Sequence, residues 1–228
     1  MDIKNTVTKK GAFSVSDKDI SSAVINRLPR YYRYLGDLLD NDVVRISSKE
    51  LSEKMHVTAS QIRQDLNNFG GFGQQGYGYN VEYLYNEIAK ILGLDRKYDM
   101  VIVGAGNIGQ AIAGYTDFEK RGFKVKRIFD INPALFGQTI RGILIDDVAN
   151  LEDFIKDNHI TIAALTLPKN QAVTMANNLV KWGIKGIWNF APIDLRLPSN
   201  VKVETVHLSD SLMRLSYNIR EMEEDKDV

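Results

Sequence analysis

The stretch from Asp99 to Gly109 constrains the fold of this chain more than any other part of the sequence. Four apolar residues without a polar break, 100–103, are typical of a buried parallel strand, and the Gly-x-Gly-x-x-Gly pattern after them predicts a tight turn into a helix. The first glycine permits the turn, the second lets a pyrophosphate approach the backbone, and the third allows close helix–strand packing. Because a helix N-terminus presents free N–H groups and a positive dipole end, we expect a dinucleotide to bind there. The predicted contact residues are Gly104, Ala105, Gly106, Asn107, Ile108 and Gly109.

A second strand-like run, 123–129, ends at Asp130, which lies 21 residues past Gly109. This is close to the spacing of roughly 20 residues expected for the acid that holds the adenine ribose. A carboxylate at this position accepts hydrogen bonds from both ribose hydroxyls and repels a 2′-phosphate, so the site should prefer NAD(H) to NADP(H). A glycine turn without a ligand is the alternative interpretation.

The composition excludes several kinds of site. Lys and Arg together number 29, as do Asp and Glu, so the net charge implies no general attraction to nucleic acid and a DNA site has to be a local patch. The absence of cysteine excludes disulfides, thiol chemistry and Cys-ligated zinc or iron–sulfur clusters. No apolar run is long enough for a membrane span. We expect a cytoplasmic protein with no metal and no membrane partner.

The N-terminal part predicts a helix-turn-helix. Apolar periodicity over 20–39 indicates two helices, the second beginning at Pro29, and capping-box spacings then open two short helices at Ser47 and Thr58. The second helix of such a pair normally enters the major groove with its N-terminal residues on base edges. Gln61 and Arg63 are the candidate base readers, since glutamine pairs with adenine and arginine with guanine. A plain helical hairpin with solvated polar residues is the alternative.

The glycine- and aromatic-rich segment 69–79 follows this helix directly and predicts a short hairpin, the wing of a winged helix. Its glycines would let the backbone approach phosphates or a minor groove closely. Basic residues for phosphate contacts are available at Arg27, Arg30, Arg33, Lys49 and Lys54. The predicted DNA-binding residues are Ser60, Gln61, Arg63, Gln64, Gln74, Gln75, Gly76 and Arg33.

The remainder of the chain alternates strands and helices, which predicts an α/β domain with a doubly wound parallel sheet. Thr166, Leu167 and Pro168 end one predicted strand, and Asn189 and Phe190 end another. Because ligands bind at the carboxyl ends of such strands, we expect both segments to border the nicotinamide; ordinary proline turns are the alternative. Residues 209–222 form an amphipathic helix whose apolar face needs a partner. The predicted domains are 1–93, 94–207 and 208–228.

Taken together, several residue runs of this chain resemble the Rex family of redox-sensing transcriptional repressors. They span nearly the whole sequence, and few families join a winged helix to a Rossmann domain in this order. The runs are 27–33 (Arg-Leu-Pro-Arg-Tyr-Tyr-Arg), 61–66 (Gln-Ile-Arg-Gln-Asp-Leu) with the glycine-rich segment after it, the glycine loop through Tyr115, and 183–192.

The resemblance implies a homodimer that binds palindromic operators with NAD⁺ or no cofactor and releases DNA on binding NADH. It also implies that the C-terminal helix is domain-swapped, inserting between the two domains of the partner. The family's switching group includes a tyrosine that matches Tyr115 and an acid just before the C-terminal helix. Here His207 stands at the acid's position. Histidine titrates near neutrality and can donate to the Tyr115 hydroxyl, so the switching hydrogen bond should differ.

Two other functions compete with a repressor. An NAD-dependent oxidoreductase with an accessory helical domain would need a catalytic group, but neither His56, His159 nor His207 has an evident catalytic partner at the strand ends. A CoA-binding domain has a similar topology, and Asp130 argues against it because a carboxylate repels the 3′-phosphate of CoA. We therefore expect a non-enzymatic sensor of the NADH/NAD⁺ ratio.

Overall fold

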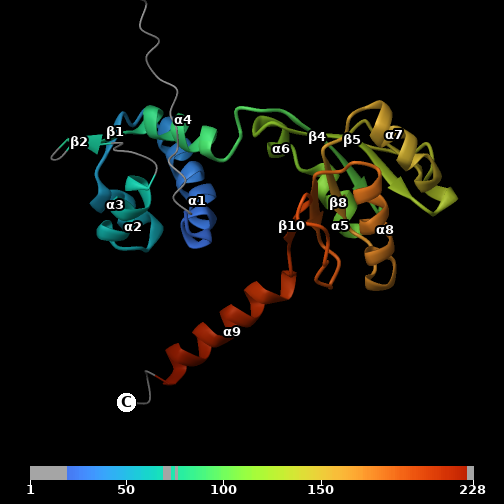
Figure 1. Cartoon of the computed structure of the whole chain (residues 1–228). Helices are drawn as coiled ribbons and strands as arrows, with labels where there is room; N and C mark the ends of the chain where they lie inside the picture. Colours follow the sequence, from blue (N-terminus) through green and yellow to red (C-terminus); the bar gives the residue numbers. More distant parts are fainter. Residues whose placement is uncertain (1–19, 69–72, 75–76, 225–228) are drawn as a thin grey trace, which may run out of the picture. The chain divides into compact units, whose positions relative to one another are not determined.

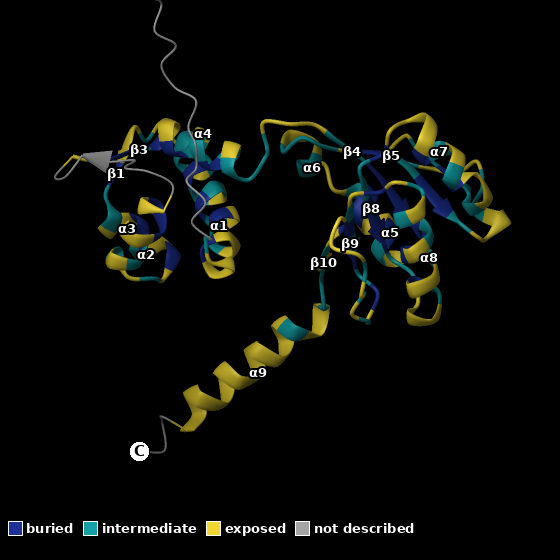
Figure 2. Ribbon diagram, viewed as in Figure 1, coloured by how far each residue is buried: buried dark blue, intermediate teal, exposed yellow. Residues whose placement is uncertain are grey.

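The structure, a computed structural model, describes residues 20–68, 73–74 and 77–224 (Figure 1). Contacts divide the chain into two compact units, Met1–Asp95 (unit 1) and Arg96–Val228 (unit 2). Each unit has a hydrophobic core of its own. In Figure 2 the strands of the large sheet are mostly buried, whereas the C-terminal helix is exposed along nearly all of its length.

Unit 1 has the winged-helix fold that the sequence predicts. Its elements are α1 (Ser22–Leu39), β1 (Arg45–Ile46), α2 (Ser48–Met55), α3 (Ala59–Asn67), β2 (Gly73–Gln74), β3 (Gly78–Asn80) and α4 (Val81–Ile91). The three short strands pair antiparallel in the order β1-β3-β2. The helices enclose a core centred on residues without solvent exposure, among them Leu28, Leu35, Leu51, Ile62 and Leu84.

One helix replaces the two that the sequence predicts before residue 40. Pro29 lies inside α1 and does not begin a new helix. Proline in a helix interior costs on the order of 3 kcal/mol, because it removes a hydrogen bond and its ring meets the preceding turn. Residues on both sides of it, Val24, Leu28, Tyr31 and Leu35, form one continuous buried face. The burial of this face offsets the cost and keeps the helix unbroken.

The helix-turn-helix is set by local capping. Ser47 accepts a hydrogen bond from the Glu50 backbone and the Glu50 carboxylate accepts one from the Ser47 backbone, which is a complete capping box for α2. His56 ends α2 in the left-handed conformation, with φ of 51°. The Thr58 hydroxyl then caps α3 by accepting a hydrogen bond from the Gln61 backbone at 3.1 Å.

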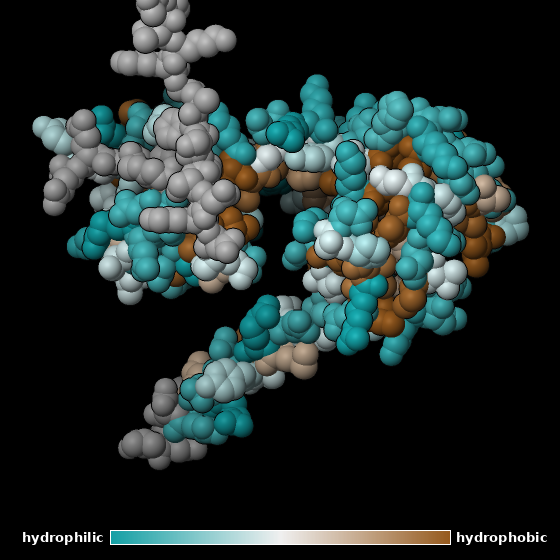
Figure 3. Space-filling view, in the orientation of Figure 1, coloured by the Kyte–Doolittle hydropathy of each residue, from teal (hydrophilic) through white to brown (hydrophobic). Residues whose placement is uncertain are grey.

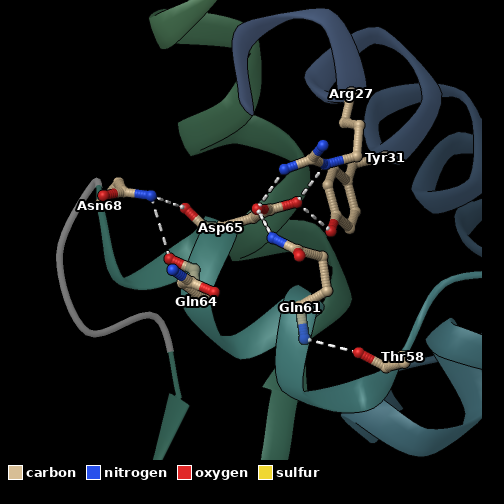
Figure 4. A network of polar contacts seen from close by, with 7 residues as sticks. All are labelled: Arg27, Tyr31, Thr58, Gln61, Gln64, Asp65 and Asn68. Atoms are coloured by element: carbon tan, nitrogen blue, oxygen red, sulfur yellow. Dashed lines mark hydrogen bonds and ion pairs between the residues drawn. The ribbon is translucent and has the colours of Figure 1, made fainter. Parts of the chain in front are cut away.

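A buried carboxylate joins α1 to α3 (Figure 4). Asp65 has no solvent exposure, and its two oxygens receive a bidentate pair of bonds from Arg27 Nε and Nη2, each of 2.7 Å. The Tyr31 hydroxyl donates to the same carboxylate at 2.9 Å, and Gln61 Nε2 donates at 2.7 Å. Arg27, which the sequence suggested as a phosphate contact, is therefore engaged inside the unit.

These contacts determine the protonation states of Asp65 and Tyr31. Burial alone would raise the pKa of the Asp65 carboxyl, but the hydrogen bonds from Arg27, Gln61 and Tyr31 outweigh burial and lower the pKa below its ordinary value of 3.8. Burial and the bond to Asp65 raise the pKa of the Tyr31 hydroxyl. These four side chains form what we call the clamp, in which the ionised Asp65 carboxylate accepts hydrogen bonds from Arg27, Tyr31 and Gln61 at neutral pH.

Unit 2 is a doubly wound sheet in the order β10-β9-β8-β4-β5-β7-β6. All neighbouring pairs are parallel except β6 and β7. The strands are β4 (Tyr98–Val103), β5 (Phe123–Asp130), β6 (Thr139–Ile140), β7 (Ile143–Asp147), β8 (Ile162–Leu165), β9 (Gly186–Asn189) and β10 (Lys202–Thr205). The strand order reverses between β4 and β8, where a Rossmann sheet binds its dinucleotide.

The two faces of this sheet carry separate cores. One core includes Phe129, Leu165 and Leu179, and the other includes Ile102, Ile128 and Ile112. Figure 3 shows hydrophobic surface in the central part of the visible face of unit 2, with hydrophilic surface around it. The helices and 3₁₀ turns are α5 (Asn107–Gly114), α6 (Asp117–Lys120), η1 (Pro133–Leu135), η2 (Val148–Asn150), α7 (Leu151–Asp157), α8 (Lys169–Lys181) and α9 (Leu208–Glu224).

Breaking the clamp should destabilise unit 1. We expect Arg27→Ala to lower the free energy of unfolding near neutral pH by on the order of 3 kcal/mol, because it leaves a buried carboxylate without its charge partner. Since the pKa of Asp65 is lower in the folded unit than in the unfolded chain, its stabilising effect is complete above about pH 4 and is lost as the pH falls through the folded pKa. Urea unfolding followed by circular dichroism should therefore show the wild type and the variant converging in acid. Arg33→Ala, at an exposed position of the same helix, is the control. Equal losses in both variants near neutral pH would contradict the assignment.

The glycine turn in unit 2 makes a second prediction. A Cβ at Gly109 would overlap the Gly104 carbonyl oxygen, whereas a Cβ at Gly114 meets nothing within 4 Å. We expect Gly109→Ala to lower the melting temperature of unit 2 by several degrees and Gly114→Ala, in the same helix, to leave it nearly unchanged. Thermal unfolding of the two variants side by side measures the difference. Indistinguishable melting would show that the turn relaxes without cost.

Candidate nucleotide and nucleic-acid sites

The glycine turn connects β4 to α5 at the point where the strand order reverses. Gly104 has φ of 107°, and a Cβ on it would lie 2.8 Å from both the Thr166 carbonyl and the Thr166 hydroxyl. A Cβ on Gly106 would meet nothing within 4 Å. Gly106 is also the N-cap of α5 and supplies no capping side chain, so no side chain caps the first N–H groups of the helix. Together they form the anion-binding end of a helix.

Ala105 is held on both sides of this turn. Asp130 Oδ2, at the end of β5, accepts a hydrogen bond from Ala105 N at 2.6 Å, and Gln110 Nε2 donates to Ala105 O at 2.8 Å. Asp130 Oδ1 also accepts from Asn132 N at 2.8 Å. A carboxylate has about four lone-pair sites, so Asp130 keeps acceptors for further donors. Gln110 could not be predicted from the sequence, because an exposed helical glutamine has no distinguishing pattern.

The end of β8 meets the turn directly. The Thr166 hydroxyl lies 3.0 Å from Val103 O and 2.8 Å from Gly104 O, so its proton is shared between two carbonyls of the glycine turn. Leu167 is half-buried, and a Cβ on Gly104 would lie 3.2 Å from its side chain. Pro168 is exposed and forms the N-cap of α8. Thr166 and Leu167 therefore border the turn, and Pro168 follows them at the start of α8.

Asn189 and Phe190 follow β9 with different environments. Asn189 has no solvent exposure, and its amide donates to Ile193 O at 2.8 Å and accepts from Ala191 N at 3.1 Å. The predicted direct contact with a cofactor does not fit this side chain as it lies here, because its polar groups already hold the loop after β9. Phe190 is half-buried and packs against Trp188, with ring centroids 4.6 Å apart.

An aromatic chain extends from this loop to α5. Trp188 contacts Phe118 edge-on at a centroid distance of 5.5 Å, and Phe118 lies 4.7 Å from the ring of Tyr115. Tyr115 is the C-cap of α5 and is 52% exposed. Two predicted site residues from separate elements, Tyr115 and Phe190, are thus connected through two residues that the sequence analysis did not single out.

His207 lies between β10 and α9. Its Nε2 is 3.4 Å from Asp194 Oδ1, and 31% of its side chain is exposed. Asp194 is itself 89% exposed, so the contact lies at the surface.

The predicted DNA-binding residues of α3 differ in their exposure to solvent. Ser60, Arg63 and Gln64 are exposed, and Arg63 Nη1 lies 3.0 Å from the Ser48 hydroxyl on α2. Gln61 differs, since it is half-buried and bonded to Asp65. Arg33 is exposed on α1.

The wing contains the remaining predicted DNA contacts. Gln74 belongs to β2, while Gln75 and Gly76 lie outside the described residues. At the edge of the wing, Arg45 Nη1 donates to Tyr77 O at 3.3 Å, and the Tyr77 side chain is 71% exposed.

Searches for two other kinds of site gave negative results within the described ranges. No group of three or more His, Cys, Asp or Glu residues there is arranged to hold a metal ion. No helix in the same ranges has the length and apolar character needed to cross a membrane.

Comparison with known families agrees with this two-part arrangement. A family model described as "CoA binding domain" matches residues 95–193, and one described as "Putative DNA-binding protein N-terminus" matches residues 19–67. The chain is 65% identical over 204 residues to the redox-sensing transcriptional repressor Rex of Caldanaerobacter subterraneus subsp. tengcongensis, which covers 90% of this chain and 91% of that protein. It is 62% identical to the Rex repressor of Clostridioides difficile, over 91% of this chain and 99% of that one.

Solved structures agree as well. The crystal structure of RSP in complex with beta-NAD⁺ and operator DNA is 64% identical in sequence, with a TM-score of 0.84, and covers 92% of this chain and 97% of that one. A crystal structure of RSP with beta-NADH is 61% identical, with a TM-score of 0.85, over 92% and 99% of the two chains. The same protein is described as a Rex-family repressor. The chain whose glycine turn and winged helix are described above therefore belongs to the Rex family of redox-sensing transcriptional repressors.

Proposed function

We propose that this chain represses transcription by binding palindromic operator DNA with NAD⁺ or no cofactor, and that NADH releases it. The observation that carries the proposal is the 64% identity, over 92% of this chain, to a repressor crystallised with both beta-NAD⁺ and operator DNA. The residues support it independently, since one chain joins a helix N-terminus without a capping side chain, in a Rossmann turn, to a winged helix with exposed polar side chains on α3. Such a protein acts on chromosomal DNA in the cytoplasm.

The cofactor residues follow from the geometry of the turn. We assign the pyrophosphate to the N–H groups of the turn and of the first turn of α5, where Gly106 leaves space. Asp130 would hold the adenine ribose and keep its bond to Ala105, which favours NAD(H) over NADP(H). Thr166, Leu167 and Pro168 would border the nicotinamide together with Phe190 and Tyr115. Asn189 would act indirectly, by holding the loop. The full set is Gly104, Ala105, Gly106, Asn107, Ile108, Gly109, Asp130, Tyr115, Thr166, Leu167, Pro168, Asn189 and Phe190.

The DNA residues divide into readers and positioning contacts. Arg63 and Gln61 of α3 would contact base edges, with Ser60 and Gln64 beside them. Arg33 and the wing residues Gln74, Gln75 and Gly76 would contact the backbone. Contacts of the second kind carry little sequence information but set the register on the duplex.

A homodimer would supply the second half-site. No residue of α9 is buried, and its exposed apolar side chains are Leu208, Leu212, Met213, Leu215, Tyr217, Ile219 and Met222. Leu208, Leu212, Leu215, Ile219 and Met222 recur at helical spacing and form one stripe, which a swapped helix would bury against the partner. We propose domains at 1–93 and 94–207, with 208–228 as the swapped segment.

The switch requires that NADH and NAD⁺ favour different arrangements of the dimer. A differential binding energy of about 1.4 kcal/mol changes DNA affinity tenfold. We assign this response to Tyr115 and His207. A histidine can donate a hydrogen bond where the family's acid only accepts when ionised, so the switching hydrogen bond would differ from the family's.

Two other activities are separable from this one. The match to a CoA-binding model follows from a shared sheet topology, and the carboxylate of Asp130 at the ribose position argues against CoA in this chain. An oxidoreductase would consume NADH with a small carbonyl compound, whereas a sensor binds NADH without turnover.

Titration of the protein onto a labelled palindromic promoter fragment tests the proposal at fixed salt. We expect NADH, but not NAD⁺, to release the fragment, with no loss of NADH absorbance. Gly106→Ala should bind the fragment normally but need at least about tenfold more NADH for release, because its Cβ occupies the pyrophosphate position. Gly114→Ala, at the other end of α5, should behave as the wild type. Absence of sequence-specific binding in every state would overturn the repressor proposal.

The dimer makes a separate prediction. We expect Leu212→Glu with Leu215→Glu to weaken dimerisation at least 100-fold, since burying two leucines in each chain contributes about 3–6 kcal/mol per chain. Sedimentation velocity over a range of concentrations measures the effect. Thr174→Glu with Asn177→Glu places the same charge on the exposed face of α8 and should leave the dimer intact. A dimer unaffected by the leucine changes would exclude the stripe from the interface.

A further inference from the structure

Gln61 lies at the N-terminal end of α3, yet one end of its side chain is bound inside unit 1. Gln61 Nε2 donates to Asp65 Oδ1 at 2.7 Å, one helical turn further on. Figure 4 shows the amide nitrogen pointing toward the carboxylate and the amide oxygen pointing away from it. This side chain therefore has a defined orientation before any DNA is present.

The chemistry of Asp65 leaves one orientation of that amide. Arg27 and Tyr31 donate to both carboxylate oxygens, so Asp65 has no proton to offer and acts only as an acceptor. If the amide were reversed, Gln61 Oε1 would face a carboxylate oxygen at hydrogen-bond distance, and two acceptors repel each other. The surrounding contacts therefore fix the orientation of the Gln61 amide.

The outer edge of the Gln61 amide then carries a particular pattern. Oε1 is an acceptor, and Nε2 keeps one N–H beside it. In the major groove, adenine offers an N6–H donor next to the N7 acceptor, which matches this pattern, whereas guanine offers two acceptors. A glutamine free to rotate could instead turn its amino group outward, and it could then pair with either adenine or guanine.

We propose that Asp65 is a positioning residue for base recognition, which fixes the Gln61 amide so that it selects adenine over guanine at one position of each operator half-site. The inference rests on the proposed function, because it takes Gln61 as a base reader. Asp65 touches no DNA itself. Arg27 and Tyr31, both on α1, support this role because they hold the Asp65 carboxylate in place and keep it an acceptor.

Replacing the carboxylate by an amide gives a change of preference that a loss of stability alone does not produce. In Asp65→Asn, the position that accepts from both Arg27 Nε and the Tyr31 hydroxyl keeps the amide oxygen, because two donors require an acceptor there. The NH₂ then takes the position that faces Gln61, at the cost of the bond from Arg27 Nη2. Gln61 then turns its oxygen inward and its amino group outward. We expect the preferred base at that position to change from adenine to guanine, by about tenfold in relative affinity.

Selection from a library of operators randomised in one half-site measures this preference, using the full-length protein. Gln61→Met should remove the preference at the same position, and the position read by Arg63 should be unchanged in both variants. An unaltered adenine preference in folded Asp65→Asn would overturn the positioning role while leaving the repressor function standing. No selected sequence with the wild type would instead overturn the proposed function.

A measurement on the wild type covers the case in which Asp65→Asn does not fold. The side-chain amide protons of Gln61, identified by their loss in Gln61→Met, should exchange slowly with water in nuclear magnetic resonance spectra of the free protein. The exposed amide of Gln64, on the same helix, is the internal control. Equally fast exchange at both amides would show that Asp65 does not hold Gln61 and would overturn the proposal.

Discussion

The close approach of β4, α5 and β8 at the glycine turn is the constraint on which unit 2 depends. Gly104 has φ of 107°, a Cβ on it would lie 2.8 Å from Thr166, and a Cβ at Gly109 would overlap the Gly104 carbonyl. These positions exclude other residues, and in doing so they bring the N-terminus of α5, the Asp130 carboxylate and the end of β8 to one edge of the sheet. A nucleotide site is the direct result of that packing, since free N–H groups and a ribose acceptor meet where the strand order reverses.

Buried polar side chains give each unit a unique internal arrangement. Within the described residues the buried polar or charged ones are Asp65 in unit 1 and Asn189 in unit 2. Asp65 joins α1 to α3, and Asn189 holds the loop after β9 by bonds to Ala191 and Ile193. A satisfied buried network of this kind specifies geometry more strictly than apolar packing does, because every alternative arrangement leaves a polar group without a partner. In both units the network lies next to a segment proposed to contact a ligand.

Local patterns in the sequence predicted most of the fold and part of the sites. The glycine turn, Asp130, the capping boxes and the paired short helices were readable because each depends on residues close together in the chain. Asp65 was not, since its partner Arg27 is 38 residues earlier and an acid on the polar side of a helix looks solvated. The prediction that Pro29 begins a second helix was wrong for the converse reason. The continuous buried face of α1 outweighs the local preference of proline to begin a helix. Asn189 and Gln110 hold backbone groups within five residues of themselves, and no sequence pattern distinguishes such an amide from a solvated one.

The distribution of tryptophan gives the protein an internal optical label. The chain has two tryptophans, Trp182 and Trp188, and both belong to unit 2. Trp188 lies in the aromatic chain that leads through Phe118 to Tyr115, so its emission should respond to events at the proposed nicotinamide end. Unit 1 contains tyrosine but no tryptophan, so it does not contribute to the fluorescence when only indole is excited. Intrinsic fluorescence excited at the indole band therefore reports on unit 2, and an extrinsic dye on DNA can record operator occupancy in the same cuvette at the same time.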